Sequence, residues 1–119
     1  MTIDSFIATL NAAPDSIQFS DTIAVIETHY EFTSTAFQNG AIKNEAGQNS
    51  GSCKLFSFAK LHGLTEQQTL ACFGDYYRID VLQHPKAQDH QNIRNFIQFG
   101  WKGIQFDQQA LNTKQSLGN

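Results

Sequence analysis

Positive charge is scarce in this sequence. Its 119 residues include eight lysines and arginines against eleven aspartates and glutamates, which gives a net charge of −3. The two arginines, Arg78 and Arg94, lie far apart, and the lysines form no cluster. Proteins that bind nucleic acids without sequence preference, or that dock on anionic membranes, use clustered basic residues. We therefore expect neither a nucleic-acid partner nor a membrane partner.

The sequence also has no long apolar run, no basic residue near its start and only two cysteines. No apolar run approaches the ~20 residues that span a bilayer. The first sixteen residues, MTIDSFIATLNAAPDS, carry Asp4 and no basic residue, so we expect a helix of the folded protein and not a cleaved signal peptide. Cys53 and Cys72 are the two cysteines. We expect the protein to be cytoplasmic, and in the cytoplasm both cysteines stay reduced.

Apolar residues are abundant, and they recur at helical spacing. They make up 40% of the chain and include ten phenylalanines, which is enough for a hydrophobic core. The three-four spacing predicts helices over residues 3–12, 20–31, 51–62, 65–83 and 89–99. Gly74 lies inside the fourth of these, where it costs about 1 kcal/mol relative to alanine. Asn39-Gly40 predicts the two-residue type I′ turn of a small β-hairpin near residues 36–43.

These patterns together predict a mainly α protein with minor α+β character. We expect one compact domain over residues 1–119, built of about five helices and the small hairpin. The polar stretch 111–119 is expected to fray.

One polar run, NGAIKNEAGQNSGSCK over residues 39–54, ends in a cysteine where a helix is predicted to begin. The positive end of a helix and the neighbouring Lys54 both favour a thiolate, so an exposed Cys53 would have a lowered pKa. It could then act as a nucleophile with a histidine base, for which His29, His84 and His90 are the candidates and His90 is the one we select. The other interpretation is a small buried side chain at a helix start, which is the commoner fate of a free cysteine.

Two further segments carry polar groups of chemical interest. Arg78 lies in DYYRID, where it could hold a carboxylate or phosphate, or form an ordinary surface pair with Asp75. His84, His90 and Arg94 lie in the segment HPKAQDHQNIR. The histidine spacing matches no zinc pattern, so we expect neither a metal nor a cofactor.

Several stretches carry a family resemblance. They are FSDTIAVIETHYEF (19–32), AFQNG (36–40), NSGSCKLFSFA (49–59), TLACFGDYYRIDVLQHP (69–85) and DHQNIRNFIQFGW (89–101). In this order they resemble the HopJ type III effector family over about the whole folded region. The resemblance implies a possible route of secretion through a type III system, with a host protein as the partner of a true effector. It implies no activity, cofactor or catalytic residue.

Three functions follow as hypotheses, of which the last is a structural or accessory domain with no discrete ligand. The first is a binding or interaction domain for a protein or a small molecule. The second is a small enzyme that uses Cys53 as nucleophile. In the first two cases we expect the loop 44–53 to form one wall of a cleft, with His84, His90 or Arg94 on the other. The expected ligand-binding residues are Asn44, Asn49, Ser52, Arg78, His84 and Arg94.

Overall fold

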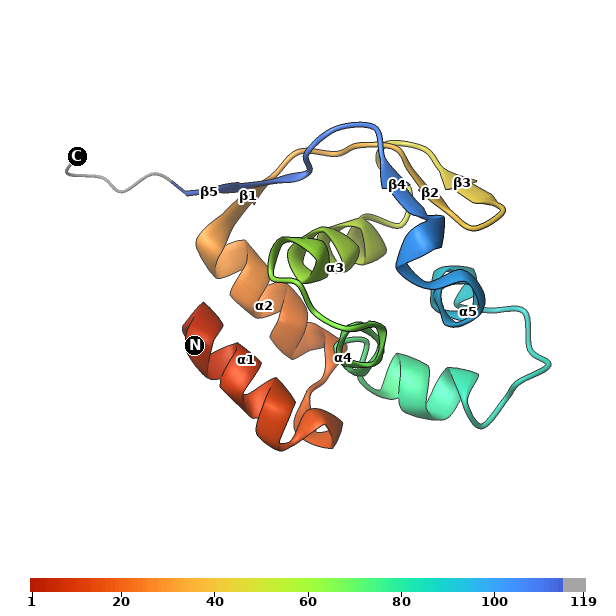
Figure 1. Ribbon diagram of the computed structural model, residues 1–119, viewed down its shortest axis with the longest axis horizontal. Helices are drawn as coiled ribbons and strands as arrows, with labels where there is room; N and C mark the ends of the chain where they lie inside the picture. The colour runs from red at the N-terminus through yellow and green to blue at the C-terminus, as the bar shows by residue number, and fades with distance from the viewer. Residues whose placement is uncertain (115–119) are drawn as a thin grey trace.

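The computed structural model describes residues 1–114, and its helices lie beneath a band of short strands (Figure 1). The α-helices are α1 (Ile3–Ala12), α2 (Phe19–His29), α3 (Ser50–Leu61), α4 (Glu66–Ala71) and α5 (Gln91–Phe99). Two 3-10 helices, η1 (Pro14–Ser16) and η3 (Gly100–Gly103), and a π-helix, η2 (Tyr76–Val81), complete the helical part. The predicted mainly α fold with minor β structure is confirmed. No helix in the described residues is long and apolar enough to cross a membrane.

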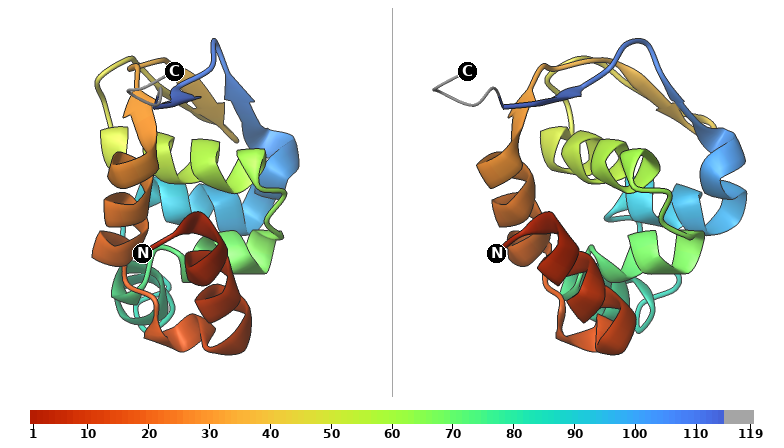
Figure 2. Two further views of the ribbon diagram at one scale, coloured as in Figure 1. Left: turned by 90° about the vertical axis from the view of Figure 1, so that its left-hand side faces the viewer. Right: turned by 60° about the vertical axis from the view of Figure 1, so that its left-hand side comes forward.

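The strands form two small antiparallel sheets along one side of the helices. In one sheet β1 (Tyr30–Phe32) pairs with β5 (Leu111–Thr113). In the other, β2 (Phe37–Asn39) lies between β3 (Ile42–Asn44) and β4 (Ile104–Phe106). Both sheets lie over α3, as the turned views also show (Figure 2). The prediction that the chain frays from Leu111 is wrong for residues 111–113, because β5 pairs with β1; residues 115–119 lie outside the described part.

The predicted hairpin is present, with its turn one residue later than expected. Asn39 pairs with Ile42, so Gly40 and Ala41 form the turn. Of these two residues only Gly40 has a positive φ, at 61°, which is the pattern of a type II′ turn and not of the predicted type I′. This shift places Asn39 within β2, where its side chain is fully buried. Because the turn comes one residue later than expected, the side-chain amide of Asn39 lies in the core.

The predicted helix 65–83 is broken in its middle. It begins with a capping box between Thr65 and Gln68, but α4 ends at Ala71 and a turn leads into η2. Gly74 has a φ of +63° and lies against the backbone of Gln18 and Phe19. An alanine Cβ at this position would lie 2.7 Å from Gln18 Cα. The close approach of α2 is therefore the physical reason for the break.

One hydrophobic core joins all these elements. Phe56, Phe58 and Leu55 of α3 are fully buried at its centre. Phe56 contacts Phe73 and Phe96, with ring centroids 5.4 and 5.0 Å apart. Helices lie below α3 and strands lie above it. Apolar residues therefore occupy nearly every side of this helix. The first residues of α3, by contrast, lie at the edge of the core and carry the polar run.

Candidate functional site

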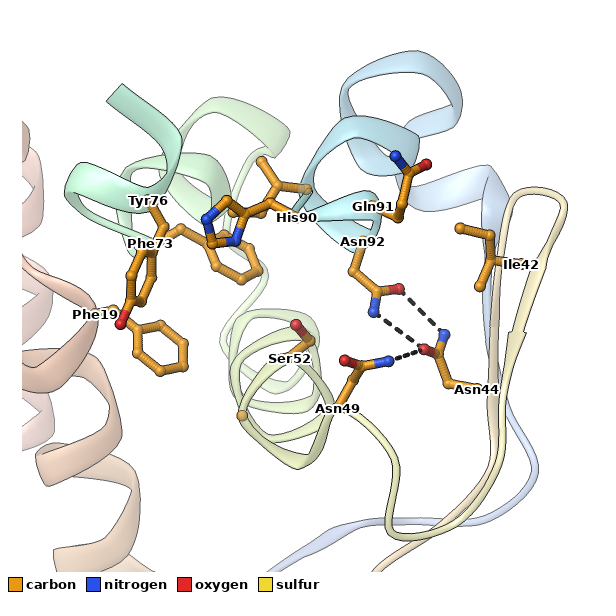
Figure 3. Close-up of a pocket in the computed structure, with 12 residues that line it drawn as sticks. Phe19, Ile42, Asn44, Asn49, Ser52, Phe73, Tyr76, His90, Gln91 and Asn92 are labelled. Atoms are coloured by element: carbon orange, nitrogen blue, oxygen red, sulfur yellow. Dashed lines mark hydrogen bonds between the residues drawn. The ribbon is translucent and has the colours of Figure 1, made fainter. Parts of the chain in front are cut away.

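A pocket of about 360 Å³ opens where α3 and α5 begin. Its walls come from four parts of the chain: the start of α2, residues 42–52, residues 73–76 and the start of α5. Figure 3 shows aromatic side chains on one side of it and side-chain amides on the other. Its volume falls in the usual range for small-molecule sites. The full set of lining residues is Phe19, Ile42, Asn44, Asn49, Gly51, Ser52, Phe73, Tyr76, His90, Gln91, Asn92 and Ile93.

The aromatic wall consists of Phe19, Phe73 and Tyr76. The rings of Phe19 and Phe73 are nearly parallel, with centroids 6.0 Å apart. Tyr76 contacts Phe19 at 5.4 Å and the imidazole of His90 at 5.1 Å. Tyr76 is 45% exposed although it is a large apolar side chain. The break at Gly74 directs the chain so that this ring, the first residue of η2, borders the pocket.

Side-chain amides form the opposite wall. Asn44 and Asn92 make a reciprocal pair: Asn92 Nδ2 donates to Asn44 Oδ1 at 3.0 Å, and Asn44 Nδ2 donates to Asn92 Oδ1 at 3.1 Å. Asn49 Nδ2 donates to the same Asn44 oxygen at 2.7 Å. Behind them, buried Asn39 donates to the backbone oxygen of Asn92 at 2.8 Å. The amides therefore hold the hairpin, α3 and α5 in one arrangement.

Both helices begin in the pocket without a side-chain cap. The residues that precede them, Asn49 and His90, each have a φ of 50°. They are the two non-glycine residues with positive φ in the described part of the chain. Neither side chain caps its own helix. Asn49 instead donates to Asn44, and His90 Nε2 lies 3.0 Å from Asp80 Oδ2.

The first backbone N–H groups of these helices consequently lack partners. Within residues 1–114, no protein acceptor receives the N–H of Ser50, Gly51 or Ser52 in α3, or of Gln91 or Asn92 in α5. Uncapped N–H groups carry the positive end of the helix dipole. Four of these five residues also line the pocket. The pocket thus combines an aromatic surface with a cluster of hydrogen-bond donors.

The structure brings four of the sequence-predicted site residues together. Asn44, Asn49, Ser52 and His90 all line the pocket. From the loop 44–53, the pocket is lined by Asn44, Asn49, Gly51 and Ser52, and His90 borders it as well. The other four, Cys53, Arg78, His84 and Arg94, do not line it.

The two arginines stabilise turns instead of facing the pocket. Arg78 donates to the backbone oxygens of Pro14, Ile17 and Ala71, and so joins η1 to the end of α4. Its guanidinium also lies 3.8 Å from Asp75.

Arg94 holds the loop before α5. It donates to Asp89 Oδ1 at 2.7 Å and to the backbone oxygen of His84 at 3.0 Å. The Arg94 side chain also holds the pKa of Asp89 below its usual range. His84 contributes its carbonyl to this contact, and its imidazole does not line the pocket.

The thiol of Cys53 is placed as a core residue. Asn49, and not Ser50, precedes the helix, so Cys53 is its fourth residue. It is 1% exposed and does not line the pocket. Burial raises its pKa and outweighs the nearby charge of Lys54. The expected lowering of this pKa is therefore wrong, and the structure gives no support to its pairing with His90.

The sequence did not assign Phe19, Phe73 or Tyr76 to a site. The first two follow the helical spacing of core residues, and Phe73 is 2% exposed. Asn92 lies in the same polar segment as Arg94, which is the signal that points to it in the sequence. In the described residues, no group of three histidines, cysteines or carboxylates is placed to hold a metal ion.

Comparison with known proteins agrees with the resemblance seen in the motifs. A family model described as HopJ type III effector protein matches residues 3–111. This chain belongs to the HopJ family. It is also similar to a solved crystal structure of the unknown function protein VPA0580, with 52% sequence identity and a TM-score of 0.94. That match covers 96% of this chain and 95% of the other. No curated protein matches.

Proposed function

We propose that this HopJ-family protein is a binding domain for a small anionic molecule with a flat apolar group. The observation that carries the proposal is the composition of one pocket. Uncapped N–H groups of two helices lie there opposite an aromatic wall. Pockets with a largely apolar surface and a few convergent polar groups are the usual form of small-ligand sites.

The two walls define two parts of the ligand. The N–H groups of residues 50–52 and 91–92 are donors, so they suit a carboxylate or phosphate. The exposed ring of Tyr76, which lies 5.1 Å from the His90 ring at a tilt of 34°, offers a flat surface for an aromatic group. His90 Nε2 lies 3.0 Å from Asp80 Oδ2, and this contact fixes the orientation of the His90 ring beside Tyr76.

The amide wall explains why the donors stay available. Asn49 would be the natural cap of α3, but its amide is held by Asn44 at 2.7 Å. Keeping Asn49 in the left-handed region costs energy that a glycine would avoid. A protein selected for stability alone would cap both helices with their own side chains, which stabilises by about 1 kcal/mol each. A bound anion supplies the missing partners.

A pair of matched variants tests the anion. Ser52 of α3 and Ser5 of α1 both occupy the third position of a helix. A carboxylate there stabilises a helix by about 0.3–1 kcal/mol. We expect Ser52→Asp to raise or preserve the melting temperature and to abolish binding of phenyl phosphate. Ser5→Asp should have the same effect on stability and leave binding intact.

Binding is measured by chemical-shift changes of backbone amides in an NMR titration. Phenyl phosphate should shift the amides of residues 50–52 and 91–92, and should bind more tightly than inorganic phosphate or phenol. Tyr76→Ala should remove the advantage over inorganic phosphate. Equal affinity of the wild type and Ser52→Asp for phenyl phosphate would contradict the proposal, as would shifts confined to other regions.

A second candidate rests on the family description. Because the matching family is described as HopJ type III effector protein, we propose that the chain is a substrate of a type III system and that its partner is a host protein. A translocation reporter fused to the full chain tests export. Signal in host cells that disappears in a secretion-deficient strain is the expected result, and equal signal from both strains contradicts it.

A further inference from the structure

A second cavity, of about 320 Å³, lies on the opposite side of α3 from the core below it. The connection between β4 and β5 passes over α3 in Figure 1, and the cavity lies between them. Leu61, Phe106, Ala110 and Leu111 give it a mainly apolar lining. None of its lining residues belongs to the pocket at the helix starts.

Two polar side chains of α3 distinguish this cavity from an ordinary packing gap. Ser57 lines it and is 7% exposed, and its hydroxyl oxygen has no hydrogen-bond partner in the described residues. A buried hydroxyl without a partner is costly, and a serine inside a helix usually bonds the carbonyl four residues back. The Cys53 thiol lies close enough to this hydroxyl for the hydroxyl to oppose the rise of the thiol's pKa. Because no hydrogen bond of normal geometry satisfies the hydroxyl within the described residues, a polar group of a bound molecule would be its first full partner.

Lys60 supplies a positive charge at the mouth of the cavity. Its Nζ lies 5.7 Å from the ring centroid of Phe106, which borders the same space. No carboxylate of residues 1–114 lies within ion-pair distance of it. Ser57 and Lys60 are three residues apart on a helix and so face the same side. One anionic group at the mouth can therefore meet both donors.

We propose that this cavity binds a medium-chain aliphatic carboxylate. The apolar lining suits an unbranched alkyl chain, since no aromatic pair in it forms a slot for a planar ring. A single ammonium group beside a hydroxyl suits a single carboxylate, which is ionised at neutral pH. The ligand's tail lies against Ala110 and Leu111, and its carboxylate lies at Lys60 and Ser57.

The test is an NMR titration with octanoate at pH 7, below its micelle concentration, followed through backbone amides. The amides of Ser57, Lys60 and Leu111 should shift, and affinity should rise about fourfold per methylene from hexanoate to octanoate, which is the ~0.8 kcal/mol expected for each buried CH₂. Octanol should bind at least threefold more weakly than octanoate. Shifts confined to the pocket at the helix starts would overturn this inference and leave the proposed function standing.

Two variants of α3 make the charge test specific. Lys60→Gln keeps the apolar stem and removes the charge, so octanoate affinity should fall to that of octanol. Lys54 lies on the same helix, pairs with Glu27 at 3.1 Å and does not line the cavity. Lys54→Gln should therefore leave octanoate binding within twofold of the wild type. Equal loss in both variants, or equal affinity for octanoate and octanol in the wild type, would overturn the proposed carboxylate.

Discussion

Replacing Gly74 with alanine is the sharpest test of this structure, because two descriptions of residues 65–83 predict opposite signs. In a continuous helix, alanine would be better than glycine by about 1 kcal/mol. In the structure, Gly74 has a φ of +63°, and the added Cβ would lie 2.7 Å from Gln18 Cα and 2.8 Å from the Phe19 nitrogen. Both contacts are with backbone, which cannot rotate away.

The expected loss of stability has two parts. The left-handed conformation costs an alanine about 1–2 kcal/mol, and relieving the contact with the start of α2 costs about 1–3 kcal/mol. The sum is about 2–5 kcal/mol. With an unfolding entropy of ~2.1 cal/mol/K per residue over 119 residues, 1 kcal/mol corresponds to about 4 °C, so the melting temperature should fall by about 8–20 °C.

Gly63 provides the matched control. Its φ is +62°, nearly that of Gly74, but nothing lies within 4 Å of an added Cβ. Gly63→Ala should therefore lose only the conformational part, about 4–8 °C by the same conversion. Both variants are compared by thermal unfolding followed with circular dichroism. A Gly74→Ala protein that melts at or above the wild-type temperature would refute the broken helix, and equal losses in both variants would refute the contact with α2.

Three further predictions concern the cysteines, the amide network and one histidine. Burial raises the pKa of Cys53 and raises that of Cys72 to about 12, so neither should react with iodoacetamide at pH 7.5 until denaturant is added; labelling of Cys53 in the native protein, read by mass spectrometry, would contradict this. Asn92→Ala leaves the buried amides of Asn39 and Asn44 short of partners, at about 1–3 kcal/mol for each. The melting temperature should therefore fall far more than for Asn95→Ala, a half-buried residue of the same helix that donates only to the Gln91 carbonyl. Burial lowers the pKa of His62, whose ring bonds the Tyr30 hydroxyl at 2.8 Å. The unfolded chain then takes up a proton more readily, so stability should be full above pH 6.5 and fall as the pH drops below it; a His62→Gln variant with the same pH dependence would show that another group is responsible.

Local patterns in the sequence predicted most of the elements. The capping box of Thr65 and Gln68, the helical stripe of α1 and the Asn39-Gly40 hairpin each depend on residues a few positions apart, and each is present. The helix-start position of Cys53 was likewise read within one residue. The sequence left two interpretations of Cys53 open, and the buried one is confirmed; the choice depends on the strands that cover α3.

Only part of the candidate site could be predicted, because local patterns identify polar residues but not the residues that pack beside them. The polar run over residues 44–52 and His90 were singled out by chemistry that is visible in the sequence, and the structure places them around one pocket. The aromatic wall was missed, since Phe19 and Phe73 follow the periodicity of core residues and border both core and pocket. Arg78 and Arg94 carry the same charge as many ligand-binding arginines, but their carbonyl partners come from η1 and from the loop before α5.

The sequence by itself determined the mainly helical fold, the position of the hairpin and the family, because these depend on periodicity, turn residues and motifs. Tertiary structure alone decided that the helix breaks at Gly74, that Leu111–Thr113 becomes a strand and that Asn39 is buried. Each of these depends on a partner distant in sequence: Gln18 for Gly74, Tyr30–Phe32 for β5, and Asn92 for Asn39. A local pattern carries no information about such partners, since a glycine, a polar tail or an asparagine is compatible with several environments until packing selects one.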